Sequence, residues 1–124
     1  MNALVLLGHG SRDPGWVAPL VRVREVVTHA RPALAVELAF LEFMSPTLEE
    51  AVAALAGCGA TRIVVAPVFL AQGGHLRRDL PARLDSLRQR YPACTLRLAT
   101  VAGEAPGVIA AIAAHVGAQA DLPG

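Results

Sequence analysis

The sequence of 124 residues is poor in several residue types: it has no lysine, two cysteines and 4% aromatic residues, and its formal net charge is +1. A charge so close to zero argues against a dedicated nucleic-acid-binding protein, which normally carries a basic excess. Cys58 and Cys94 form no CxxC motif, so we expect free thiols and no disulfide framework. No uncharged run reaches the roughly 18 apolar residues of a membrane span, and the N-terminus lacks the basic region of a signal peptide. These absences predict a cytoplasmic protein that engages neither nucleic acid nor a membrane.

The residues that are present indicate a single α/β domain over residues 1–124. Hydrophobic residues make up 54% of the sequence and charged residues 17%, which is typical of a well-buried globular chain. Short β-friendly apolar runs predict strands at 2–7, 34–43, 62–69 and 94–100. Apolar residues at helical spacing predict helices at 14–30, 46–57, 76–91 and 105–116.

The apolar spacing also predicts how these helices begin and what they bury. In the first helix, Trp16 and Leu20 belong to one apolar stripe, together with Val23 and Val27. Ser45 is the expected N-cap of the second helix, directly ahead of Pro46 at its first position. The last helix is expected to bury Val108, Ile109 and Ile112.

Strand and helix alternate four times, and this alternation predicts the topology. It calls for a parallel sheet with helices on both faces, because each right-handed crossover returns its strand beside an earlier one. We expect a four-stranded sheet in the order 2-1-3-4. In that order the switch point lies between strands one and three, and ligands bind beyond the carboxyl ends of the strands there.

The loops after strands one and three both carry a histidine beside glycines. The first reads Gly8-His9-Gly10-Ser11-Arg12 and the second Ala71-Gln72-Gly73-Gly74-His75. Glycines let the backbone turn sharply and keep bulk away from the imidazole. Each histidine alone could simply cap a helix or bond to backbone, but two of them at one switch point indicate a functional crevice.

Glu42 follows strand two and lies among apolar neighbours in Phe40-Leu41-Glu42-Phe43. A buried carboxylate needs a partner or a function, although the strand alternation leaves open whether Glu42 faces the crevice or the surface. Two imidazoles and one carboxylate make an incomplete coordination shell, and imidazole suits Co, Ni, Fe and Zn. The set predicts an exchangeable metal rather than a closed structural site.

Arg77 and Arg78 open the helix that follows His75. Cations at a helix N-terminus oppose the macrodipole unless something anionic offsets them. Together with Arg12 they could bind the carboxylates of an acidic ligand over the crevice. The alternative is a solvated face with Asp79 as the local partner.

Several spaced motifs resemble the short CbiX-type sirohydrochlorin chelatases of the class II chelatase family. They are Leu7 to Arg12, the Ala39-Phe40-Leu41-Glu42 segment, Pro67 to Leu70, and Gly74-His75 followed by Asp79-Leu80-Pro81. The similarity covers roughly residues 4–81, and the last third of the chain agrees by pattern only. The spaced combination is specific, whereas Gly-His-Gly-Ser-Arg alone is only suggestive.

The resemblance implies ATP-independent insertion of a divalent metal, Co²⁺ first and Ni²⁺ or Fe²⁺ as alternatives, into sirohydrochlorin in tetrapyrrole biosynthesis. His9 and His75 correspond to the metal-binding pair and Glu42 to the acidic residue of the site. Ser11, Arg12, Phe69, Leu70, Arg77 and Arg78 are then expected to bind the substrate. No cofactor beyond the transferred ion is implied.

The resemblance also implies a homodimer with facing crevices, because longer relatives hold two such halves in one chain and residues 1–124 correspond to one half of the bilobal unit.

Two other functions fit parts of this pattern. A metal or tetrapyrrole carrier on the same fold would bind tightly without turnover. A histidine phosphatase would carry an Arg-His-Gly element after strand one, but Gly8 stands where that arginine is needed. The sequence does not decide between cobalamin, sirohaem or another tetrapyrrole as the destination of the product.

Overall fold

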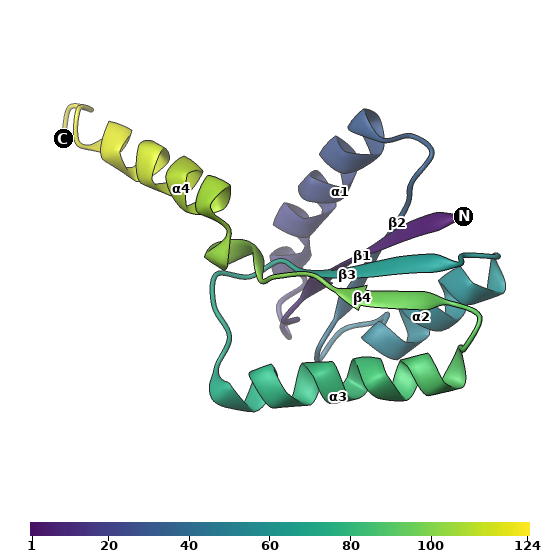
Figure 1. Cartoon of the computed structure of the whole chain (residues 1–124). Helices are drawn as coiled ribbons and strands as arrows, with labels where there is room; N and C mark the ends of the chain where they lie inside the picture. Colours follow the sequence, from purple (N-terminus) through teal and green to yellow (C-terminus); the bar gives the residue numbers. More distant parts are fainter.

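A computed structural model describes residues 1–124 and contains one sheet of four parallel strands in the order β2-β1-β3-β4 (Figure 1). The strands are β1 (Asn2–Gly8), β2 (Ala35–Phe40), β3 (Arg62–Pro67) and β4 (Thr95–Leu98). In register, Leu6 of β1 lies between Leu38 of β2 and Ala66 of β3. The predicted strand order and parallel sheet are therefore confirmed, with β2, β3 and β4 shorter than expected.

Four helices alternate with these strands. They are α1 (Ala18–Ala30), α2 (Leu48–Gly57), α3 (Gly74–Arg90) and α4 (Pro106–Gln119), with short 3-10 helices η1 (Pro14–Val17) and η2 (Ala102–Glu104) before α1 and α4. α1 covers one face, while α2 and α3 cover the other (Figure 1). None of the helices combines the length and the apolar character needed to cross a bilayer.

The start of α2 differs from the predicted one. Thr47, not Ser45, is the N-cap: its side chain accepts a hydrogen bond from the Glu50 N–H, and the Glu50 carboxylate accepts one from the Thr47 N–H. This reciprocal pair is a capping box, which satisfies two otherwise unpaired donors at once. The helix therefore begins at Leu48, two residues later than Pro46.

The two faces of the sheet are unequally buried. A cluster of fifteen buried residues fills the space between the sheet, α2 and α3, and it includes Val5, Ile63, Val65 and Leu84 at 0% exposure. The cluster on the α1 face has four buried residues: Leu6, Leu20, Leu38 and Phe40. Most of the hydrophobic stabilisation thus comes from one side of the sheet.

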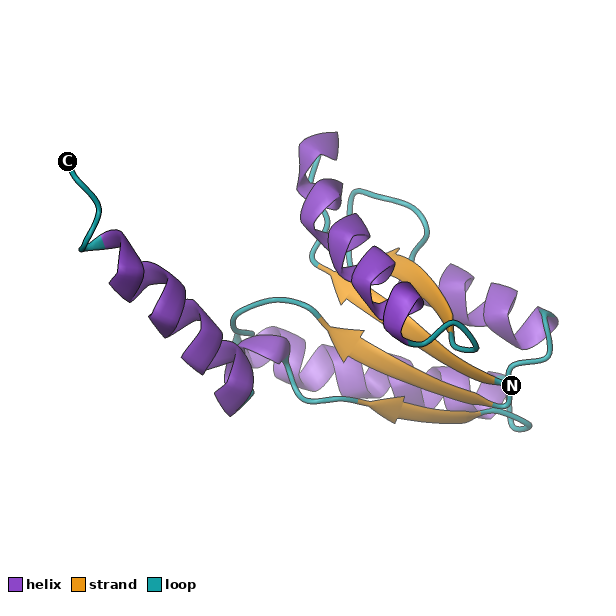
Figure 2. Cartoon of the chain, turned by 90° about the horizontal axis from the view of Figure 1, so that it is seen from above, coloured by secondary structure: helices purple, strands orange, loops and turns teal.

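α4 does not pack as predicted. It projects away from the rest of the molecule (Figures 1 and 2) and contains no buried residue. Val108 is half-buried, while Ile109 and Ile112 are 52% and 41% exposed. Ala105, which joins η2 to α4, is extended with φ −75° and ψ 128°.

Candidate functional site

The loop after β1 is held against the loop after β2 by backbone hydrogen bonds. The Leu41 N–H donates to the Gly8 carbonyl at 3.0 Å, and the Glu42 N–H donates to the His9 carbonyl at 3.1 Å. Gly10 has φ +87°, and a Cβ there would lie 1.9 Å from the Glu42 carbonyl oxygen. Glycine is required at position 10 because the two backbones approach closely and because the left-handed conformation disfavours a side chain.

The other glycines beside the two histidines differ in what they contact. A Cβ on Gly8 would lie 3.1 Å from the Leu20 side chain, so Gly8 lets α1 pack closely onto the end of β1. Gly73 and Gly74 have no atom within 4 Å of an added Cβ. The glycines around His9 therefore serve close backbone packing more than they clear space for the imidazole.

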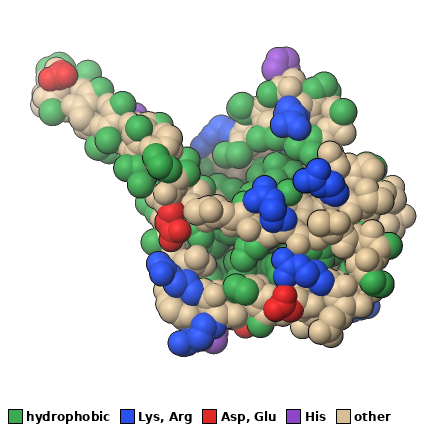
Figure 3. Space-filling view, in the orientation of Figure 1, with side chains coloured by type: hydrophobic (Ala, Val, Ile, Leu, Met, Phe, Trp, Pro, Cys, Tyr) green, Lys and Arg blue, Asp and Glu red, His purple; other side chains and the backbone are tan.

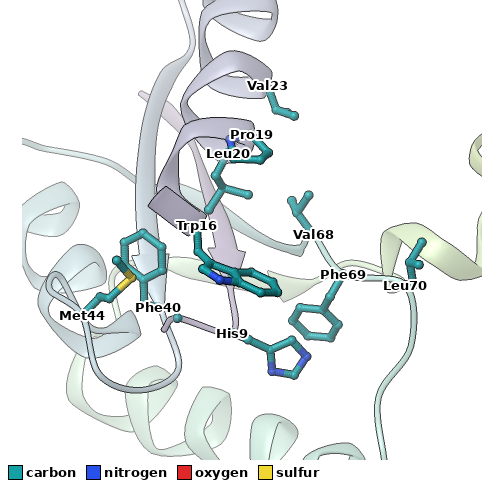
Figure 4. Close-up of a pocket in the computed structure, with 12 residues that line it drawn as sticks. His9, Trp16, Pro19, Leu20, Val23, Phe40, Met44, Val68, Phe69 and Leu70 are labelled. Carbon is teal, nitrogen blue, oxygen red and sulfur yellow. The ribbon is translucent and has the colours of Figure 1, made fainter. Parts of the chain in front are cut away.

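A pocket of about 340 Å³ lies between α1 and the carboxyl ends of β1 and β3 (Figure 4). The His9 ring is at its mouth, with its centroid 4.3 Å from that of the Phe69 ring and the two planes 37° apart. Most of the wall is apolar. The lining residues are Gly8, His9, Gly10, Trp16, Pro19, Leu20, Val23, Phe40, Met44, Val68, Phe69 and Leu70.

Trp16 and Val23 were predicted to lie with Leu20 on one apolar stripe, but only Leu20 is buried. Trp16 is 70% exposed and lies across the pocket from Phe69 (Figure 4). Helical spacing does not reveal this role, because it identifies an apolar stripe and not what covers it. The usable signal was position: Trp16 follows the loop after β1, where the topology places ligands.

His75 and Glu42 lie outside this pocket. His75 is exposed in the first turn of α3, and Glu42 is exposed in the loop after β2, so Glu42 is not surrounded by its apolar neighbours. Nowhere in the chain do three His, Cys, Asp or Glu side chains come together as a group that could hold a metal ion. Both residues do lie on loops or turns at the carboxyl end of the sheet, and their joint role with His9 stays a prediction.

The predicted substrate-binding arginines have different environments. The Arg12 guanidinium lies 4.8 Å from the centre of the Phe43 ring. Arg77 donates from Nε to the Gln72 carbonyl at 3.4 Å and forms a 3.7 Å ion pair with Glu104, not with Asp79. Arg78 is exposed and has no ion-pair partner within the chain.

Ser11 has a local structural role in the same region. Its Oγ accepts a hydrogen bond from the Asp13 N–H at 3.0 Å, and Asp13 in turn accepts one from the Gly15 N–H at the start of η1. Phe69 is half-buried against His9, while Leu70 is 68% exposed at the edge of the pocket. Ser11 thus shapes the turn that follows His9, and Phe69 and Leu70 both line the pocket.

A parallel α/β sheet with an apolar, imidazole-bearing crevice at its topological switch point defines a small-molecule-binding domain of the doubly wound class. The family model for CbiX matches residues 3–119 of the chain. The chain therefore belongs to the CbiX family.

Individual relatives agree with this assignment. The chain is 43% identical over 91 residues to the sirohydrochlorin cobaltochelatase of Methanocaldococcus jannaschii, which covers 73% of this chain and 64% of that relative. The chain thus spans less than two thirds of that curated relative's length. The crystal structure of a CbiX protein from Marinobacter aquaeolei VT8 is 31% identical with a TM-score of 0.84 and covers 98% of both chains.

A further solved structure shows the same fold in a longer chain. It is the sirohydrochlorin chelatase SirB from Bacillus subtilis subspecies spizizenii in complex with cobalt, which is 28% identical with a TM-score of 0.78. The match covers 94% of this chain but 50% of the SirB chain. This chain therefore corresponds to half of that protein.

Proposed function

We propose that this protein inserts a divalent metal, with Co²⁺ as the preferred ion, into sirohydrochlorin without ATP. The observation that carries the proposal is His9, an exposed imidazole in contact with the Phe69 ring at the mouth of an apolar pocket, in a chain of the CbiX family. The sirohydrochlorin cobaltochelatase from Methanocaldococcus jannaschii supports both the substrate and the ion.

The proposed reaction exchanges two protons for one metal ion. The M²⁺ ion leaves its protein and water ligands and binds the ring nitrogens, and two pyrrole N–H groups lose their protons. The site therefore needs weak ligands for the ion and a base within hydrogen-bond reach of the ring. In this proposal His9 and His75 hold the ion, and the exposed Glu42 carboxylate accepts protons.

The pocket suits one edge of a flat acidic macrocycle. Its walls are apolar and its volume of about 340 Å³ lies at the lower end of the range for small-molecule sites, so the rest of the ring extends past Leu70. In this proposal the carboxylates of the macrocycle bind to Arg12 and Arg78, neither of which has an ion-pair partner. Arg77 would exchange its ion pair with Glu104 for a substrate carboxylate.

The proposed active unit is a homodimer with its two crevices facing each other. Support comes from the SirB comparison, in which this chain covers half of a longer chain of the same fold. Two copies would supply both halves of such a unit, and the second crevice would enclose the part of the macrocycle that one pocket leaves exposed. The cytoplasmic location expected from the sequence stays a prediction.

The experiment that tests the function follows the absorption of sirohydrochlorin mixed with the purified full chain and Co²⁺, then Ni²⁺, then Fe²⁺, against the uncatalysed rate. We expect acceleration that is greatest with Co²⁺ and is lost in H9A and in H75A. H29A is the matched control, because His29 is an exposed histidine near the end of α1 and its replacement should leave the rate unchanged.

The same measurement separates an enzyme from a carrier. A carrier would bind the tetrapyrrole or the ion in proportion to protein and show no turnover beyond one equivalent. Metallation that stops at one equivalent, or a wild-type rate in both H9A and H75A, would reject the proposed activity or the proposed site respectively.

A further inference from the structure

Phe43, in the loop after β2, has a backbone conformation that few side chains adopt. Its φ is +66°, and it is the single non-glycine residue of the chain with a positive φ. A bulky side chain in this left-handed region costs free energy, and such residues persist only where their surroundings hold them. Phe43 is also 58% exposed and belongs to neither hydrophobic cluster. Burial in a core therefore does not account for this aromatic residue.

The loop after β1 holds the backbone directly before Phe43. The Glu42 N–H donates to the His9 carbonyl at 3.1 Å. Gly10 approaches the Glu42 carbonyl oxygen so closely that a Cβ on Gly10 would lie 1.9 Å from it. Glu42 is thus held through both of its peptide groups. The strained conformation of Phe43 is therefore imposed by the packing of these two loops.

The Phe43 ring contacts Arg12 of the loop after β1. The Arg12 guanidinium carbon lies 4.8 Å from the ring centroid, which is within the range of about 6 Å for a cation–π contact. Turns flank Arg12 in the sequence: the Asp13 N–H donates to the Ser11 Oγ at 3.0 Å, and the Gly15 N–H donates to the Asp13 carboxylate at 2.9 Å. Both residues of the contact therefore stand on backbone that is held in place.

Arg12 differs from the arginines that form ion pairs. Arg77 pairs with Glu104 and Arg88 with Asp85, and Figure 3 shows acidic side chains beside basic ones on one face of the molecule. Arg12 has no ion-pair partner in the chain. An aromatic face does not occupy the guanidinium donors as a carboxylate does. Arg12 is thus held by a ring while its N–H groups stay free for a ligand.

We propose that Phe43 is a positioning residue, whose ring holds the Arg12 guanidinium so that its free N–H groups bind one carboxylate of the tetrapyrrole. This inference rests on the proposed function for its ligand. A bidentate guanidinium–carboxylate pair needs a defined orientation, and orienting a long arginine side chain in advance reduces the entropy lost on binding.

The separation of Arg12 from His9 fits this role. Arg12 stands three residues after His9, so at most about 11 Å of chain separates them. A tetrapyrrole carries its carboxylates at the rim of the macrocycle. When the ring nitrogens face the His9 imidazole, a guanidinium at this separation meets the rim. The strained backbone at Phe43 thus serves to place a side chain at the edge of the site.

The first test measures the affinity for metal-free sirohydrochlorin through the fluorescence of Trp16, the single tryptophan of the chain. We expect F43A to weaken binding about two- to fivefold, the contribution of a cation–π contact at an exposed site, and R12A to weaken it about tenfold or more. F43Y keeps an aromatic face and should bind as the wild type does. R90A is the matched control, because Arg90 lies over Tyr91 at 5.8 Å, outside the pocket.

A double-mutant cycle separates positioning from direct contact. If Phe43 acts through Arg12, F43A added to R12A causes no further loss of affinity. If the Phe43 ring touches the macrocycle itself, the two losses multiply. The loss in F43A should also shrink at high salt, because the contact between Arg12 and a carboxylate is screened. Multiplied losses, or an F43A affinity equal to that of the wild type, would overturn the proposal.

The variant F43G tests for a purely structural role. Glycine adopts a φ of +66° without strain, so F43G should unfold in urea at or above the wild-type midpoint while binding as weakly as F43A. A lower midpoint in F43G would overturn the proposal, because it would mean that the ring stabilises the fold.

Nuclear magnetic resonance tests the contact without any ligand. The ring current of Phe43 should shift the Arg12 side-chain protons upfield in the wild type and in F43Y, and the shift should be lost in F43G. Unshifted Arg12 protons in the wild type would contradict the contact itself.

The outcomes for Phe43 and for the proposed function are distinguishable, because no readout used here requires metallation. Coupled losses of binding without accelerated metal insertion would refute the proposed activity and leave the role of Phe43 standing. Accelerated metal insertion together with an unchanged affinity in F43A would do the reverse. A wild-type chain that does not bind sirohydrochlorin would overturn both.

Discussion

Replacing Gly10 by alanine perturbs the site without removing any side chain from it. Gly10 has φ +87°, and the new Cβ would lie 1.9 Å from the Glu42 carbonyl oxygen. The left-handed conformation costs an alanine about 1–2 kcal/mol, and separating the two backbones breaks the Glu42–His9 hydrogen bond, which contributes about 0.5–1.5 kcal/mol. We therefore expect G10A to lower the free energy of unfolding by about 2–3 kcal/mol and to displace His9.

The assay is urea denaturation at one fixed protein concentration, because association makes stability depend on concentration. For a small domain with an m value of roughly 1–3 kcal/mol per M, the midpoint should fall by about 1–2 M. Metallation should fall as well, since the His9 carbonyl and the Glu42 N–H separate. The control is G57A: nothing lies within 4 Å of an added Cβ there, and alanine at a helix end should be neutral or stabilising by up to about 1 kcal/mol.

Wild-type stability in G10A would refute the reasoning, because it would mean that the loops after β1 and β2 separate at no cost. Loss of stability with an unchanged metallation rate would refute the link between this contact and the position of His9. Equal losses in G10A and G57A would show that the effect is a general property of glycine replacement.

Four further substitutions test separate parts of the structure. W16A should weaken tetrapyrrole binding about tenfold at unchanged stability, with V26A as the control, measured by fluorescence titration. R78A should also weaken binding, most strongly at low salt, because its guanidinium is expected to meet a carboxylate; an affinity that does not change would place Arg78 on a solvated face. T47A should cost about 1 kcal/mol of unfolding free energy through loss of the α2 cap. L84A should cost about 2–5 kcal/mol, since Leu84 is 0% exposed, and a smaller loss would mean that the core collapses around the gap.

The sheet could be predicted from the sequence because its signals are local and its topology has few solutions. The runs around Val5 and Val65 are short and apolar, and a helix follows each strand, so a parallel sheet with right-handed crossovers is expected. The order 2-1-3-4 is that of flavodoxin-like sheets. The start of α2 could also be predicted from the sequence. Glu50 stands three residues after Thr47 and completes a capping box that Ser45 cannot form. The same spacing rule would have corrected the prediction.

The remaining errors have one physical cause. Helical spacing shows which residues share a stripe, but not which surface covers it, so Trp16 and Ile112 were both assigned to the interior and both are exposed. In the first case a pocket replaces the covering layer, and in the second the whole helix projects away from the sheet. The position of His9 in the loop after β1 followed from the topology alone. The distances between the side chains of His9, His75 and Glu42 depend on the conformations of the loops, which residue spacing does not predict.

Phe69 joins the loop after β1 to the segment before α4, which lie near opposite ends of the sequence. Its ring supports the imidazole of His9, and its carbonyl accepts the Gly103 N–H, while the next carbonyl, on Leu70, lies so close to Gly103 that a Cβ would be 1.9 Å away. Gly103, in the short helix before α4, is therefore held by the backbone of the same residue whose ring contacts His9. An insertion or deletion in η2 should therefore also displace the Phe69 ring that contacts His9.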